Sequence, residues 1–173
     1  LLTMPGSIQI GPAVVCVTDI ADHRSVLVQV ILTVPVPLSS RFYQLAENSF
    51  SGRALEWTAL LTGLGSDVGE SVAQAGRAPV GSDGVRFLPW LLGSIAPSPN
   101  DDVRAAWTGL SVRHERGHLL RATMEGVALN LGWLGPAVAQ FVGVTWTFFS
   151  CGGGGAQSAL CTQIVASDEN RRV

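Results

Sequence analysis

The sequence predicts an α/β layer fold, in which helices pack on a β-sheet. Two features predict it. Short runs of β-branched residues, which are typical of strands, are concentrated in residues 1–46. Residues 115–166 then carry, in order, a long helical pattern, an apolar strand pattern, a glycine-rich turn and a short helical pattern. A helix, a strand and a second helix in succession indicate layers that contain both kinds of element.

The amino-terminal part of the chain is expected to form antiparallel hairpins. Its β-branched runs lie at residues 8–10, 14–18 and 26–34. Glycine, proline or polar residues separate these runs, as in turns between strands. A further strand is expected at residues 84–90, before a loop at residues 93–101 that is rich in proline, serine and asparagine.

Helices are expected in three further regions. Apolar residues at helical spacing begin near residue 52, with Ser49 or Ser51 as the N-cap, and residues 67–75 carry a weaker pattern of the same kind. The longest helix is expected at residues 115–131, because the glycine and proline of residues 132–136 are typical of a helix end.

A strand at residues 142–149, a turn at residues 151–158 and a helix at residues 159–166 complete the predicted chain. Phosphate groups commonly bind where a strand leads through a glycine turn into a helix. Glycines let the backbone approach an anion without a Cβ in the way, and the free N–H groups of the first helical turn point at it. The GxxxxGK[ST] pattern is absent from this turn, and a flexible loop without a ligand is the alternative interpretation.

The composition excludes some kinds of chemistry. All 11 basic residues are arginine, so Schiff-base chemistry and lysine-dependent phosphate binding are excluded within the chain. A formal charge of −2 without a basic patch argues against a nucleic-acid partner. Hydrophobic residues make up 47% and charged residues 14%, which is more apolar than most soluble domains. We therefore expect apolar surface that another domain covers or that leads to self-association.

The chain is expected to be cytoplasmic and to stay out of the membrane. Cys16, Cys151 and Cys161 match neither a zinc-binding spacing nor a disulfide framework, so reduced thiols are expected. No apolar stretch reaches the roughly 18 residues of a membrane span. The first residues lack the charged region of a signal peptide. The chain also begins without an initiator methionine, so a piece of a longer protein is expected.

Some polar residues have two interpretations. His114 and His118, one helical turn apart, indicate either a metal or phosphate site or a role at a helix start, and the lack of a carboxylate partner favours the helix start. Asp101 and Asp102 indicate either magnesium binding or a solvated turn, which their Pro-Ser-Asn context favours. Ser158 has no His/Asp relay, which argues against a hydrolase. The tryptophans have two interpretations, stacking on a sugar or burial in the core or at a domain interface. The apolar composition favours burial for most of them.

Several blocks of sequence together resemble the carboxy-terminal domain of the FGGY carbohydrate kinases, with xylulokinase-like members most similar. The resemblance covers residues 1–173. Its blocks are Ser51-Gly52 with Ala54, Leu55 and Trp57; Phe87-Leu88-Pro89-Trp90 with Gly93 and Pro97; Arg104, Gly109-Leu110, His114, Arg121-Ala122 and Glu125-Gly126; and Gly153-Gly154-Gly155-Ala156-Gln157-Ser158 with Gln163-Ile164.

The resemblance implies an actin-like, ribonuclease-H-like ATPase domain with a mixed sheet flanked by helices. It implies that ATP, with Mg²⁺, binds in a cleft between this domain and a homologous amino-terminal domain. That second domain carries the catalytic aspartate and most sugar contacts and is absent from these residues, so no catalytic residue and no metal ligand is assigned here. The nucleotide-binding residues carried over are Gly52 and Glu56 near the ribose and base, and Gly153, Gly154, Gly155, Ala156 and Ser158 at the glycine turn.

Two functions remain open. The first is the ATP-binding part of a kinase that phosphorylates a pentulose or related sugar and is inactive without its amino-terminal domain. The second is a catalytically inactive remnant or interaction module that keeps the fold without ATP. Thr3-Met4-Pro5-Gly6 and Gly93-Ser94-Ile95 depart from the family's Gly-Thr-Ser-Gly and Gly-Glu-Arg, which favours the second. The intact glycine turn and Ser51-Gly52 favour the first.

Overall fold

The computed structural model of the protein describes residues 2–11, 14–21 and 30–169. The strands lie at Leu2–Ile10 (β1), Val14–Ile20 (β2), Leu32–Pro35 (β3), Phe42–Asn48 (β4), Arg86–Leu88 (β5), Ala106–Thr108 (β6) and Val144–Gly152 (β7). The α-helices lie at Gly52–Leu61 (α1), Val68–Arg77 (α2), Arg116–Val142 (α3) and Ala159–Glu169 (α4), and short 3-10 helices at Ser82–Gly84 (η1) and Gly154–Gln157 (η2).

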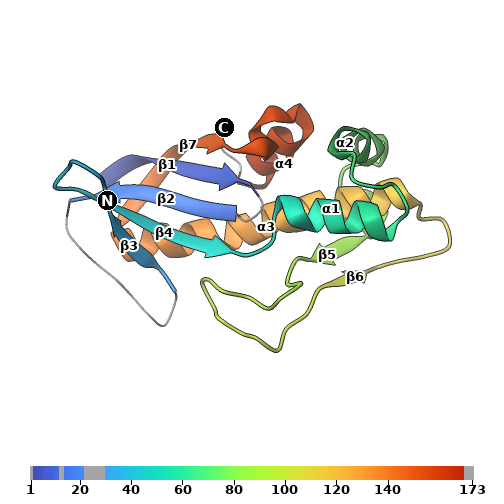
Figure 1. Ribbon diagram of the computed structural model, residues 1–173, viewed down its shortest axis with the longest axis horizontal. Helices are drawn as coiled ribbons and strands as arrows, with labels where there is room; N and C mark the ends of the chain where they lie inside the picture. Colours follow the sequence, from blue (N-terminus) through green and yellow to red (C-terminus); the bar gives the residue numbers. More distant parts are fainter. Residues whose placement is uncertain (1, 12–13, 22–29, 170–173) are drawn as a thin grey trace.

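The main sheet is mixed, with the strand order β3-β4-β2-β1-β7. Its neighbouring strands are antiparallel except β1 and β7, which run parallel. Strands β5 and β6 form a separate antiparallel pair. Figure 1 shows α3 crossing behind the main sheet and continuing behind α1. The predicted α/β fold, with a mixed sheet flanked by helices, is confirmed.

The strand predictions hold for most of the sheet. The runs at residues 8–10 and 14–18 lie within β1 and β2. Of the run at residues 26–34, residues 26–29 lie outside the described part, and the strand that follows is Leu32–Pro35. Strand β4 had no separate prediction, because its alternation of buried and half-buried residues includes the polar residues Gln44 and Asn48.

The prediction that the long helix ends at residue 131 is wrong. Helix α3 continues to Val142 through the glycines and Pro136, and Leu134 and Val138 on this extension are fully buried. Burial outweighs the weak local propensity, and Pro136 is exposed. The helix ends at Gly143, which adopts φ 80° and donates its N–H to the carbonyl of Ala139.

Helix α3 joins the two parts of the core. One apolar cluster, which includes Leu120, Leu131 and Val138, lies against the main sheet and α4. A second cluster, centred on Val85 and Phe87, lies against β5. A buried hydrogen bond of 3.0 Å between the hydroxyls of Thr58 and Thr123 fixes α1 to α3.

The Arg121-Ala122-x-x-Glu125-Gly126 block holds the second cluster together. Arg121 Nε donates to Glu125 Oε1 at 2.6 Å, and the same oxygen accepts the N–H of Gly81 at 3.1 Å. A Cβ on Gly126 would overlap the carbonyl oxygen of Phe87, so only glycine lets α3 approach β5 this closely. Among the described residues, no helix combines the length and the apolarity needed to cross a membrane.

We expect Gly126→Ala to lower the free energy of unfolding by about 1–3 kcal/mol, because the added methyl group overpacks the α3–β5 contact. Gly76→Ala in α2 is the matched control, since its Cβ would lie 3.7 Å from Leu160 Cδ2, an ordinary contact. The control is expected to gain up to about 1 kcal/mol, because alanine is the better helix former. Urea unfolding measures both variants, and equal effects would contradict the proposed packing.

Candidate functional site

A cavity lies where segments distant in sequence meet. Its volume is about 400 Å³. It is bounded by the end of β1, the starts of α1 and α2, the middle of α3 and the turn between β7 and α4. Its lining comprises Ile10, Gly11, Ser51, Gly52, Leu55, Glu56, Val68, Val72, Thr123, Met124, Val127, Gly154, Gly155, Gln157, Ser158 and Cys161.

The glycine turn begins later than expected, because β7 continues through Cys151 to Gly152. Gly153 has φ 83°, and a Cβ there would lie 2.6 Å from the carbonyl oxygen of Ile10. A Cβ on Gly155 would overlap the side chain of Ile10. Glycine at 153 and 155 is therefore required by packing against the end of β1.

Gly154 differs from its neighbours. No heavy atom lies within 4 Å of the Cβ position, and its φ is not positive. The residue lines the cavity. Neither backbone strain nor packing within the described chain requires glycine at this position, and a side chain at residue 154 has open space.

The start of α1 forms another part of the cavity wall. The N–H of Gly52 donates to the carbonyl of Gly11 at 2.9 Å, and a Cβ on Gly52 would lie 2.8 Å from that oxygen. Ser51 is the N-cap residue, which decides between the two predicted serines, but its side chain makes no capping hydrogen bond. Glu56, one turn into α1, also lines the cavity.

The start of α4 adds polar groups beside the glycine turn. Ser158 Oγ accepts the N–H of Cys161 at 3.2 Å, as in a capped helix. Gln157 and Ser158 both line the cavity. The first turn of α4 contains no acidic residue, so the positive end of its dipole is not offset there.

The floor of the cavity is apolar. It comprises Leu55 of α1, Val68 and Val72 of α2, and Met124 and Val127 of α3. An apolar pocket with a few convergent polar groups is the usual form of a small-molecule site. A flat, uncharged ring at the floor and an anionic group at the turn would match these two surfaces.

The structure brings five of the seven predicted binding residues together. Gly52, Glu56, Gly154, Gly155 and Ser158 all line the cavity. The other two, Gly153 and Ala156, lie in the same turn but outside the lining.

Sequence reasoning missed the apolar floor, Ser51 and Cys161 as cavity residues. Helical spacing of the apolar residues on α1 and α2 was visible. That spacing does not distinguish residues that line a cavity from residues packed in a core.

Cys161 is a protonated thiol in the cavity wall. Burial and, to a smaller extent, the nearby Cys151 together raise the pKa of Cys161 to about 11. Burial also raises the pKa of Cys151. Both thiols are free, as predicted, whereas the side chain of Cys16 lies outside the described part.

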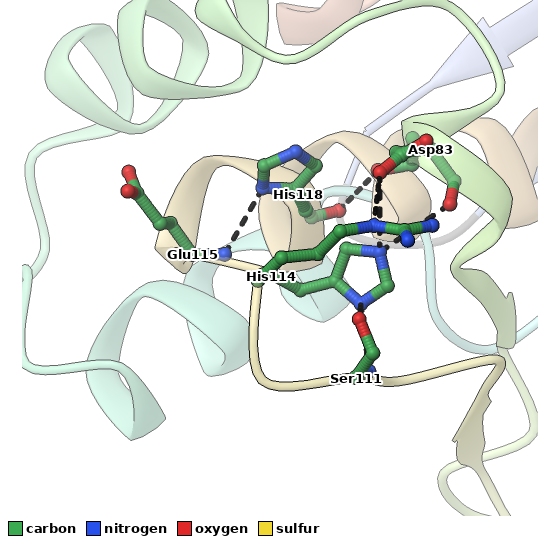
Figure 2. Close-up of polar contacts among 7 residues, drawn as sticks. Asp83, Ser111, His114, Glu115 and His118 are labelled. Carbon is green, nitrogen blue, oxygen red and sulfur yellow. Dashed lines mark hydrogen bonds and ion pairs between the residues drawn. The ribbon is translucent and has the colours of Figure 1, made fainter.

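The histidine cluster acts at the start of α3 (Figure 2). His118 Nδ1 accepts the N–H of Glu115 at 3.0 Å, and the hydroxyl of Ser82 donates to the carbonyl of His118. His114 Nδ1 accepts the N–H of Ser111 at 2.8 Å, and its ring is buried beside Asp83. The described residues contain no group of three or more metal-ligating side chains. These contacts support the helix-start interpretation for His118. His114 lies in the turn before α3 and has a carboxylate neighbour, Asp83 Oδ2 at 3.7 Å, so the expected lack of a carboxylate partner is wrong.

For the aspartates and three of the tryptophans, the contacts favour the structural interpretation. Asp101 and Asp102 are exposed, and the N–H of Asp102 donates to Asn100 Oδ1 at 2.8 Å, as in a turn. Trp57 and Trp107 stack at a ring distance of 5.2 Å. Trp146 is buried in the core. These contacts support packing roles rather than sugar stacking.

Residues 28–173 match the family described as the FGGY family of carbohydrate kinases, C-terminal domain. The chain belongs to this family. The match confirms the resemblance seen in the sequence blocks. In the structure, the Arg-Ala-x-x-Glu-Gly and histidine blocks are packing elements, and the serine-glycine and glycine-turn blocks form the two walls of the cavity.

FGGY kinases of known identity align with part of their length. Gluconokinase from Bacillus subtilis is 37% identical over 100 residues, which cover 58% of this chain and 19% of that protein. Xylulose kinase from Escherichia coli is 33% identical over 129 residues, which cover 75% of this chain and 26% of that protein. This chain therefore spans about a quarter or less of the length of these relatives.

A solved structure shares the fold. The crystal structure of xylulose kinase from Rhodospirillum rubrum superposes with a TM-score of 0.77 and 28% sequence identity, over 96% of this chain and 33% of that chain. The fold is that of the actin-like ATPases, as the resemblance implied.

We expect Cys161 to be alkylated by iodoacetamide at pH 8 at least about ten-fold more slowly than free cysteine, because the reactive thiolate is rare when the pKa is raised. A Cys16→Ala/Cys151→Ala variant isolates this thiol for mass spectrometry. The rate should rise steeply between about pH 9 and pH 11. The same variant unfolded in urea is the control and should react like free cysteine; equal rates in the folded and unfolded states would contradict the burial of Cys161.

Proposed function

We propose that this domain binds ATP and ADP and presents the terminal phosphate of ATP for transfer to a sugar hydroxyl when it is paired with an amino-terminal domain. The observation that carries the proposal is the convergence of the glycine turn and the α1 start on one cavity. Gly154 and Gly155 of the turn line the same cavity as Gly52 and Glu56 of α1. Family membership supports the same assignment.

The residues of the cavity fit a nucleotide. The open space at Gly154 lets a phosphate approach the backbone, and the uncompensated start of α4 favours an anion. The apolar floor at Leu55, Met124 and Val127 suits a purine base. When bound, ATP supplies the phosphoryl group, and this chain contributes binding and orientation.

Magnesium, the sugar and the catalytic base belong to the wider proposal. Mg²⁺ is expected to arrive on the nucleotide, because phosphate oxygens are its usual ligands. The names of the relatives support a pentulose or a related sugar as acceptor. Phosphoryl transfer requires a positioned nucleophile. The amino-terminal domain is therefore proposed to supply the catalytic base and the sugar contacts. The chain alone is proposed to have no kinase turnover. The free thiols support a cytoplasmic setting.

Nucleotide binding by the purified chain tests the proposal. Calorimetry with MgATP and MgADP is expected to show binding, and Gly154→Asp is expected to weaken it at least ten-fold, because a carboxylate would face the phosphates. Gly154 is a sharper probe than Gly155, whose Cβ would overlap Ile10 and disturb the fold. Gly76→Asp adds the same charge outside the cavity lining and is the control.

The outcome also decides between the two functions. Binding that Gly154→Asp weakens and Gly76→Asp leaves unchanged supports the kinase domain. A folded chain that binds neither nucleotide at millimolar concentration would refute nucleotide binding. The alternative, an inactive module that keeps the fold without ATP, would then be the better description.

A further inference from the structure

Ser51 carries a buried hydroxyl that the fold does not use. The residue is 3% exposed, and its Oγ has no hydrogen-bond partner among the described residues. A serine at a helix N-cap usually accepts the N–H of the second or third helical residue. Here the N–H of Ala54 is bonded to the backbone carbonyl of Ser51, and the side chain makes no cap bond.

The location of Ser51 indicates what the hydroxyl is for. Buried polar groups in native proteins are nearly always hydrogen-bonded, because burying one without a partner costs free energy. Ser51 lines the nucleotide cavity. Ser94 also has a buried hydroxyl with no partner among the described residues, but it lies outside that lining. A ligand in the cavity is therefore a suitable partner for Ser51.

The charges around the cavity indicate which part of a nucleotide lies there. Among the lining residues, which all belong to the described part of the chain, Glu56 is the one that is charged. It lies on α1, five residues after the N-cap Ser51. A carboxylate repels phosphate but readily accepts hydrogen bonds from sugar hydroxyls. The phosphates therefore belong beside Gly154 and the start of α4, where the lining has no acidic residue.

We propose that Ser51 Oγ hydrogen-bonds a ribose hydroxyl of the bound nucleotide and makes the site selective for ribonucleotides. This inference rests on the proposed nucleotide-binding function. A ribose hydroxyl both donates and accepts, as the serine hydroxyl does, so the pair satisfies both groups. Ser51 thereby becomes a specificity-determining residue of the α1 wall.

The test is calorimetry of the intact chain and its Ser51→Ala variant with MgATP, 2′-deoxy-MgATP and 3′-deoxy-MgATP. Loss of one hydrogen bond predicts that Ser51→Ala binds MgATP about three- to ten-fold more weakly. For the deoxynucleotide that lacks the contacted hydroxyl, the variant and the parent chain should bind equally. The urea midpoint of the ligand-free variant should not fall, because no bond within the described chain is lost.

Ser94→Ala is the matched control, since it removes a similar buried hydroxyl away from the cavity, and it should bind MgATP like the parent chain. Unchanged MgATP affinity in Ser51→Ala would overturn this proposal while leaving the nucleotide site intact. Equal losses for all three nucleotides would also overturn it, by indicating a contact to base or phosphate. Absence of binding by the parent chain would refute the proposed function itself, and with it this contact.

Discussion

The end of β1 fixes both walls of the cavity. The carbonyl of Gly11 accepts the N–H of Gly52 and so sets the start of α1. Ile10, one residue earlier, packs so closely against the glycine turn that Gly153 and Gly155 have no room for a Cβ. Two segments about a hundred residues apart in the sequence therefore take their positions from one pair of neighbouring residues.

Helix α3 supplies part of the apolar floor of the cavity. The close approach at Gly126 holds it to β5, and the Thr58–Thr123 hydrogen bond holds it to α1. Thr123 also lines the cavity, together with Met124 on the same helix. The helix that joins the two core clusters thus forms part of the floor of the site, so loss of its packing is expected to disturb the cavity and the fold together.

Sequence reasoning predicted the features that depend on local chemistry. Asp67, at the start of the predicted second helix, caps α2 by accepting the N–H of Glu70, and glycines mark the turn before α4. It failed where tertiary burial overrides local preference, as at Pro136 inside α3. It also treated the glycines of the turn as equivalent. The distinction between Gly154, which has open space, and Gly155, which faces Ile10, depends on a strand at the other end of the chain.

The central claim is that the α1 start and the glycine turn form one nucleotide site. Titration of the ¹⁵N-labelled chain with MgADP, followed by NMR, tests it most directly. The amide signals of Gly52, Gly154 and Ser158 should shift together with a single Kd, while that of Gly109, outside the cavity, should not move. Shifts confined to one wall, or shifts elsewhere with both walls unaffected, would contradict the account.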